Sequence, residues 1–308
     1  MSRPRVSIIG AGNVGAAAAN WIAQTGLADL ALIDIVSGVP QGKALDLQQA
    51  LPILGTSVKV TGSNDYGPTK DSDIVVITAG VPRKEGQSRE DLIATNVRIV
   101  SDVTRQVVAL SPGAILIVVS NPLDAMVYTA LKVSGFPKAR VLGMAGVLDA
   151  ARFRAFVALE LGVSAQDVAG MVLGGHGDQM VPLPRFTAVN GVPVTHLLPK
   201  KKLDAIIART RQGGGEFLPL LKTSAWVAPG AAVAQMVEAI LLDQKRLLPC
   251  AAYLEGEYGE SGLFIGVPVI VGAGGVERIV ELPLDGEERR LFQETAQKVR
   301  ETLALVKI

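Results

Sequence analysis

Short, uniformly apolar runs alternate with longer segments of helical periodicity through the first half of the chain. The short runs predict strands that are buried on both faces, and the periodic segments predict amphipathic helices. The alternation therefore predicts a parallel sheet with helices on both sides. Strands are expected at residues 6–9, 30–33, 57–61, 74–78, 115–119 and 140–142. Helices are expected at residues 13–24, 42–51, 91–110 and 123–133.

The pattern changes near residue 143. We expect a helix at 147–161, a strand at 168–173 and shorter strands within 186–193, where Asn190-Gly191 predicts a hairpin turn. Further helices are expected at 203–210, 231–242 and from 286 to the C-terminus, and apolar strands at 247–254 and 264–271. This half of the chain is therefore predicted to be α+β.

Composition narrows the class of protein. The 308 residues are 49% hydrophobic and 19% charged, which is typical of a globular enzyme of one or two domains. The net charge is +1, and no basic stripe with interleaved aromatic residues occurs, so we expect no nucleic-acid partner. The only basic run, 200–202, is interpreted as a solvated helix start. The single cysteine, Cys250, excludes an internal disulfide and favours a reducing compartment.

Two uncharged stretches are candidates for membrane or export segments. Residues 6–28 follow two arginines, but Asn13, Asn20 and Gln24 interrupt the apolar core that a signal peptide needs. Residues 262–276 are too short to span a bilayer and contain glycine and proline. We therefore expect a cytoplasmic protein without a membrane partner.

A glycine motif, Gly10-x-Gly12-x-x-Gly15, follows the first strand and opens the first helix. Gly10 permits a tight turn, Gly12 lets the backbone approach a pyrophosphate, and Gly15 lets helix and strand pack closely. Asp34 ends the next strand, where a carboxylate accepts hydrogen bonds from ribose hydroxyls and repels a 2′-phosphate. These features predict an NAD site on a Rossmann doubly wound parallel sheet, over residues 1–142. Residues 143–308 are then the α+β substrate domain.

The chain contains two histidines, His176 and His196, as candidates for acid–base chemistry. His196 lies in what we expect to be an exposed loop. His176 lies in Gly174-Gly175-His176-Gly177-Asp178 after an apolar strand, and the glycines would let a substrate or cofactor ring approach its imidazole. A histidine in an ordinary turn remains the alternative.

Three further segments carry candidate chemistry. Asp149 and Arg152 are three residues apart on one predicted helix face, as catalytic partners or as an ordinary surface ion pair. The polar loop 80–89 follows a strand end and is either a lid over a ligand or a solvated basic loop. Asn121-Pro122 follows another strand end and either contacts ligand or simply starts a helix.

Taken together, these motifs resemble the lactate/malate dehydrogenase family, most closely its lactate-dehydrogenase-like malate dehydrogenases of bacteria. The resemblance runs nearly end to end and also includes residues 248–254 and 256–259. It implies that His176 exchanges the substrate proton, that Asp149 orients and stabilises its imidazolium, and that Arg89 polarises the carbonyl. The implied substrate-binding residues are Arg83, Arg89, Asn121, Arg152 and Ser224. The implied cofactor-binding residues are Gly10, Gly12, Asn13, Val14, Gly15, Asp34, Thr78, Ala79, Gly80, Asn96, Val119 and Asn121, with no metal site.

Arg83 determines which substrate the resemblance implies. Lactate dehydrogenases of the family typically carry a neutral glutamine at the matching place, whereas a guanidinium suits the second carboxylate of malate or oxaloacetate. The expected reaction is the reversible, NAD-dependent oxidation of (S)-malate. The alternatives are an L-lactate dehydrogenase, a broader 2-keto acid reductase, and a non-catalytic NAD-binding regulator. The family also implies a homodimer or homotetramer.

Overall fold

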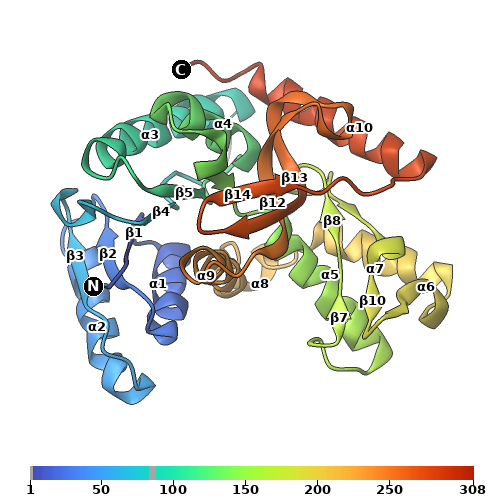
Figure 1. Ribbon diagram of the computed structural model, residues 1–308, viewed down its shortest axis with the longest axis horizontal. Helices are drawn as coiled ribbons and strands as arrows, with labels where there is room; N and C mark the ends of the chain where they lie inside the picture. The colour runs from blue at the N-terminus through green and yellow to red at the C-terminus, as the bar shows by residue number, and fades with distance from the viewer. Residues whose placement is uncertain (1–2, 83–87) are drawn as a thin grey trace.

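A computed structural model describes residues 3–82 and 88–308 of the chain. Six parallel strands form its first half, in the spatial order β3-β2-β1-β4-β5-β6 (Figure 1). Their bounds are Arg5–Ile9 (β1), Asp29–Ile33 (β2), Val60–Ser63 (β3), Ile74–Ile77 (β4), Ile115–Val118 (β5) and Val141–Gly143 (β6). The strand order reverses between β1 and β4, and ligands of such sheets bind at the carboxyl ends of the strands near this point. The predicted Rossmann sheet is confirmed.

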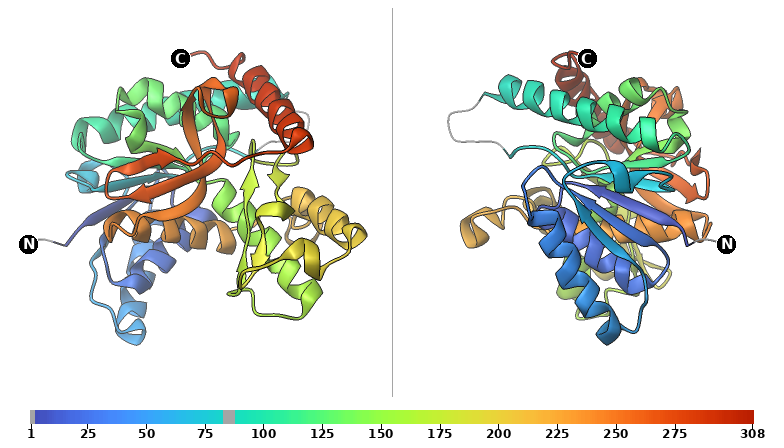
Figure 2. Two further views of the ribbon diagram at one scale, coloured as in Figure 1. Left: turned by 45° about the vertical axis from the view of Figure 1, so that its right-hand side comes forward. Right: turned by 90° about the vertical axis from the view of Figure 1, so that its left-hand side faces the viewer.

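Helices cover both faces of this sheet (Figures 1 and 2). On one face lie α1 (Asn13–Thr25), α2 (Val39–Leu54) and α9 (Val227–Leu241), and on the other lie α3 (Arg89–Leu110) and α4 (Leu123–Ser134). Successive residues of a strand point alternately into the hydrophobic cores on the two faces of the sheet. In β4, for example, Val76 packs in the core with α1, α2 and α9, whereas Val75 packs in the core with α3 and α4. Two buried faces explain why the strands are apolar at every position.

Three antiparallel strands of the second half extend the same sheet. They are β12 (Arg246–Glu255), β13 (Ser261–Gly272) and β14 (Gly275–Ile279). Ala251 of β12 pairs with Gly143 of β6, which gives a nine-stranded mixed sheet. The sequence predicted β12 and β13 as strands but neither their place beside β6 nor β14. The main sheet therefore crosses the predicted domain boundary at 142/143, and the two-domain division stays a prediction.

The remainder of the second half forms a lobe with its own core around Phe153, Val157 and Leu203 (Figure 2). The helices of this lobe are α5 (Gly146–Leu161), α6 (Val194–Leu197) and α7 (Lys200–Gln212). Its strands are β7 (Val168–Ala169), β8 (Val172–Leu173), β9 (Val181–Pro182), β10 (Ala188–Val189) and β11 (Val192–Pro193). The C-terminal helix α10 (Gly286–Leu303) packs on α4 and β13, and α8 (Leu218–Leu221) is a single turn. Across residues 3–82 and 88–308, no helix is long and apolar enough to cross a membrane.

Two local predictions in this lobe are wrong. The single strand expected at 168–173 is two short strands, because β7 pairs with β10 whereas β8 pairs with β9. Gly170 lies between them, and a Cβ there would be 3.0 Å from Cγ of Arg154, so the chain passes tightly against α5 at this point. His196 lies in the short helix α6 and not in a loop, although it is exposed as expected. The hairpin at Asn190-Gly191 is confirmed, with both residues at positive φ.

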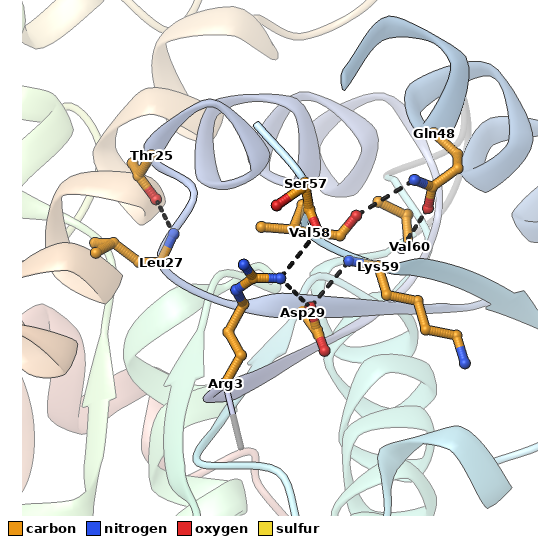
Figure 3. Close-up of polar contacts among 9 residues, drawn as sticks. All are labelled: Arg3, Thr25, Leu27, Asp29, Gln48, Ser57, Val58, Lys59 and Val60. Atoms are coloured by element: carbon orange, nitrogen blue, oxygen red, sulfur yellow. Dashed lines mark hydrogen bonds and ion pairs between the residues drawn. The ribbon is translucent and has the colours of Figure 1, made fainter. Parts of the chain in front are cut away.

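The third strand begins at Val60 and not at the predicted residue 57 (Figure 3). Side chains form hydrogen bonds with the main-chain groups around the start of this strand. Gln48 accepts the N–H of Val60 at 2.8 Å and donates to the carbonyl of Val58, while Asp29 accepts the N–H of Lys59 at 2.9 Å. The Asp29 side chain thus takes a main-chain N–H just before β3 begins, and the apolar pattern extends further than the strand.

Candidate active site

Asp149 lies between His176 and Arg152 and joins them through its two carboxylate oxygens. Oδ2 is 2.9 Å from Nδ1 of His176, and Oδ1 accepts a hydrogen bond from Nη1 of Arg152 at 3.3 Å. The Asp149 side chain is only 2% exposed, whereas those of His176 and Arg152 are 19% and 14% exposed. A buried carboxylate with two partly exposed cationic partners is unlike the surface ion pair that spacing alone allowed.

The start of α5 places Asp149 and Arg152. Asp149 is in the first turn of the helix, where the helix dipole favours a negative charge. A Cβ on Gly146, the first residue of α5, would lie 2.7 Å from Cβ of Pro249. Only a glycine therefore lets this turn pack so closely against β12, and the packing fixes where the next turn projects.

The two glycines before His176, Gly174 and Gly175, are required by contacts within the protein. Gly174 exchanges two hydrogen bonds with Gly266 of β13, and its φ is +93°. The N–H of Gly175 donates to Oγ1 of Thr295 on α10 at 2.9 Å, and a Cβ on Gly175 would lie 3.1 Å from that oxygen. The His176 loop is thus held between β13 and α10, which fixes the origin of the imidazole. Gly177 has open space around its Cα and φ of +123°.

The electrostatic surroundings favour the charged form of His176. Burial by itself would lower its pKa, but the hydrogen bond and the charge of Asp149, with a further contribution from Asp124, raise the pKa above its usual value. Arg152 acts in the opposite sense. An imidazole whose charged form is stabilised in this way can take up a proton and return it, which is what an acid–base catalyst requires.

Asp124 is a site residue that the sequence pattern did not reveal. It lies in the first turn of α4, and its Oδ2 accepts the main-chain N–H of His176 at 3.3 Å. The one available signal was an acidic residue three positions after Asn121, at the end of a parallel strand. Thr295 had no such signal, because 120 residues separate it from Gly175.

The glycine turn fits a dinucleotide. A Cβ on Gly10 would lie 2.6 Å from Oγ1 of Thr78, and one on Gly15 would lie 1.9 Å from the carbonyl oxygen of Gly10. A Cβ on Gly12 would meet nothing within 4 Å. Gly10 and Gly15 are therefore demanded by the fold, whereas Gly12 faces open space. Asn13 and Val14 form the first turn of α1, which carries no side-chain cap among the described residues, so its N–H groups suit a phosphate.

Asp34 and Lys43, which lie outside the glycine turn in the sequence, form hydrogen bonds with its main chain. Asp34 accepts the N–H of Ala11 at 2.7 Å through Oδ2 and that of Val36 at 3.0 Å through Oδ1. Lys43, from α2, donates to the carbonyl oxygen of Ala11 at 2.6 Å. Both polar groups of one residue are thus fixed by charged side chains. The residue pattern indicated Asp34 for a ribose and did not single out Lys43.

The predicted cofactor residues at the ends of β4 and β5 lie at the same edge of the sheet. Thr78 donates to the carbonyl oxygen of Gly10 at 2.8 Å, and Ala79 and Gly80 continue the chain beyond it. Asn96, 1% exposed, bonds to both main-chain groups of Val81 and to the carbonyl of Asn121. Asn96 is therefore a brace between the two strand-end loops. Val119 is half-buried, and Asn121 is exposed.

Three further predicted residues, Arg83, Arg89 and Ser224, stay predictions as substrate-binding residues. Arg89 is the first residue of α3, and its guanidinium donates to Oγ1 of Thr302 on α10. Ser224 is exposed just before α9. Arg83 lies outside the described residues. Among the residues that the structure does describe, no three His, Cys, Asp or Glu side chains gather as a metal site would require.

Comparison with known proteins matches nearly the whole chain. Residues 4–143 match the family model described as lactate/malate dehydrogenase, NAD binding domain. Residues 146–307 match the model described as lactate/malate dehydrogenase, alpha/beta C-terminal domain.

Individual relatives give the same result. A malate dehydrogenase of Roseiflexus castenholzii is 59% identical over 306 residues, which cover 99% of each chain. The structure of malate dehydrogenase from Salinibacter ruber superposes with a TM-score of 0.94 at 53% identity, covering 98% of this chain and 97% of that one. A lactate dehydrogenase from Cryptosporidium parvum, solved with lactic acid and nicotinamide adenine dinucleotide, superposes with a TM-score of 0.95 at 41% identity and covers 98% of its own chain and 99% of this one.

Proposed function

The chain belongs to the lactate/malate dehydrogenase family, and from this premise we propose that it interconverts (S)-malate and oxaloacetate with NAD and NADH. It is an NAD-dependent oxidoreductase. The observation that carries the reaction is the Asp149 carboxylate, buried between His176 and Arg152. In this arrangement His176 would transfer the proton and Arg152 would bind the carboxylate of the substrate.

His176 is the proposed acid and base. In malate oxidation its neutral ring takes the proton of the C2 hydroxyl through Nε2, because Nδ1 is occupied by Asp149. In oxaloacetate reduction the imidazolium returns that proton to the forming alkoxide. Asp149 fixes the tautomer and lowers the free energy of the imidazolium, as a buried acceptor of a charge-assisted hydrogen bond does.

Arg152 is proposed to bind the C1 carboxylate of the substrate. One nitrogen of its guanidinium contacts Asp149, so that its other donors are oriented by a rigid, buried anchor. A carboxylate held there would lie one helix turn from the group that orients His176, which supports a position for C2 beside the imidazole.

When bound, NAD would accept the hydride that leaves C2 of malate, and NADH would return it to C2 of oxaloacetate. The glycine turn and the first turn of α1, with Asn13 and Val14, are proposed to hold its pyrophosphate, since Gly12 leaves open space there. Asp34 is proposed to bind the ribose hydroxyls with the remaining lone pairs of its two carboxylate oxygens, each of which already accepts one main-chain N–H. Thr78, Ala79, Gly80, Val119 and Asn121 are proposed to line the nicotinamide end, and Asn96 to brace it.

Arg89 and Ser224 are proposed to contact the substrate as well. Arg89 would polarise the C2 carbonyl, and for this its guanidinium must exchange the hydroxyl of Thr302 for the substrate oxygen. Arg83 is proposed to bind the second carboxylate, the group that distinguishes oxaloacetate from pyruvate.

The test is a comparison of kcat/KM for oxaloacetate and pyruvate, measured by loss of NADH absorbance. Removing one partner of a buried charge pair costs about 2–5 kcal/mol, so Arg83→Gln should lower the oxaloacetate/pyruvate ratio at least about tenfold. Arg98→Gln, the same change at an exposed position of α3, is the matched control. A wild type that prefers pyruvate would reject the substrate assignment. An unchanged ratio in Arg83→Gln would reject only the role of Arg83.

We further propose that the chain works in the cytoplasm as a homodimer or homotetramer, as its family implies. The single, buried Cys250 suits a reducing compartment. Light scattering on the purified protein determines the number of subunits.

A further inference from the structure

Behind the His176–Asp149 pair lies a second carboxyl group, that of Asp124. It comes from α4 and not from α5, and its Oδ2 accepts the main-chain N–H of His176. The same oxygen would lie 3.3 Å from a Cβ on Gly175, so it is pressed against the loop. Its other oxygen, Oδ1, is shut off from solvent and has no hydrogen-bond partner in the described part of the chain. A buried polar oxygen without a partner is costly and calls for a reason.

We propose that Asp124 is a positioning residue for His176: it holds the histidine's main chain and, together with Asp149, favours the imidazolium form of its ring. The inference rests on the proposed function in one respect, that His176 exchanges the substrate proton.

The positioning part follows from how the loop is anchored. Three successive residues are tied to three different elements: Gly174 to β13, Gly175 to Thr295 of α10, and His176 to Asp124 of α4. The last bond is nearest the imidazole and is the only one of the three with a titratable partner. The same loop is therefore held by an uncharged side chain, Thr295, and by an ionisable one, Asp124.

The electrostatic part follows from the charges that face the ring. From α5 come Asp149 and Arg152, and from α4 comes Asp124. The α10 side chains nearest Gly174 and Gly175 are Thr295 and Val299, neither of which is charged. Two carboxylates thus oppose one guanidinium and the cost of burial, and a carboxylate near an imidazole favours its protonated form.

The protonation of Asp124 is linked to that of His176. Burial, with a smaller contribution from the charge of Asp149, raises the pKa of Asp124 to about 7 against the opposing positive charge of His176. When His176 takes up a proton, Asp124 is therefore driven toward its charged form, which in turn stabilises the imidazolium. The two groups titrate as a coupled pair.

The experiment follows the imidazole directly by proton NMR of the enzyme–NAD complex as the pH is varied. With only two histidines in the chain, His196→Gln assigns the two ring signals. Asp124→Asn keeps an oxygen that accepts the His176 N–H but removes the charge, so the titration midpoint of His176 should fall by about 0.5–1 pH unit. The acid limb of malate oxidation should move down by the same amount, because oxidation needs the neutral ring.

Two controls separate charge from packing. Thr295→Val removes the uncharged anchor of the loop, and it should lower kcat while the midpoint of His176 stays at the wild-type value. Asp102→Asn makes the same change of charge at an exposed position of α3 and should alter neither kcat nor the midpoint of His176. If circular dichroism shows that Asp124→Asn is unfolded, Asp124→Ser, which can still accept the N–H, carries the same expectation.

The proposal is overturned if the His176 midpoint of the Asp124 variant equals that of the wild type, or if Thr295→Val lowers the midpoint as much. The NMR titration does not depend on turnover. A wild type without activity on oxaloacetate would therefore reject the proposed function and leave this measurement to decide the role of Asp124.

Discussion

Replacing Asp149 by asparagine tests the centre of the site, because one atom changes and the shape is kept. The carboxylate is 2% exposed and lies 2.9 Å from Nδ1 of His176, so solvent does little to weaken their interaction. A hydrogen bond between charged groups contributes about 1.5–3 kcal/mol. Lost from the imidazolium in the transition state, that energy corresponds to a fall of about 10- to 150-fold in kcat/KM for oxaloacetate.

The pH dependence should change in a defined direction. The pKa of His176 is raised in part by the charge of Asp149, so Asp149→Asn lowers it. Oxaloacetate reduction needs the protonated ring, and its rate falls as pH rises through this pKa. The decline should therefore begin at lower pH in the variant, in a series of assays from about pH 6 to 9.

The asparagine amide can also donate to Nδ1, which leaves the proton on Nε2 of the neutral ring. This is the wrong tautomer to accept a proton from malate, so kcat/KM for malate should fall together with kcat/KM for oxaloacetate. NADH binding, measured by fluorescence, should stay unchanged because the glycine turn is on α1. Glu160→Gln on the exposed side of α5, where Glu160 pairs with Lys202, is the control. A fall of less than about threefold in kcat/KM would refute the assignment of Asp149.

Two further predictions concern the cofactor turn. Asp34→Ser should raise kcat/KM for NADPH relative to NADH at least about tenfold, because the charge that repels a 2′-phosphate is gone; an equal ratio in variant and wild type would argue against the ribose contact. Gly12→Ala should abolish NADH binding without changing Tm, since its Cβ meets only open space, whereas Gly15→Ala should also lower Tm by several degrees, because its Cβ would lie 1.9 Å from the Gly10 carbonyl oxygen. Calorimetry and NADH titration measure both, and equal Tm losses in the two variants would contradict the distinction.

Much of the first half of this protein is determined by local sequence. A strand buried on both faces must be apolar throughout, and a turn that approaches a phosphate must contain glycine. Both demands act over a few residues, so the local pattern was enough to place Gly10, Gly12 and Asp34. The start of β3 is the exception, because it depends on side chains that are distant in the sequence. Asp29 and Gln48 accept the main-chain N–H groups of Lys59 and Val60, and the local pattern gives no sign of these bonds.

The second half depended on contacts between residues far apart in the chain. Nothing near Ala251 indicates that β12 will join Gly143 at the edge of the sheet. The glycines before His176 resembled a ligand loop, but they are needed because β13 and α10 press on that loop. Charge and spacing left open whether Asp149 and Arg152 form an ordinary surface pair, and only burial showed that they do not. Sequence alone thus determined which residues could do the chemistry, whereas tertiary packing determined which of them face one another, because burial and distance arise only when remote segments meet.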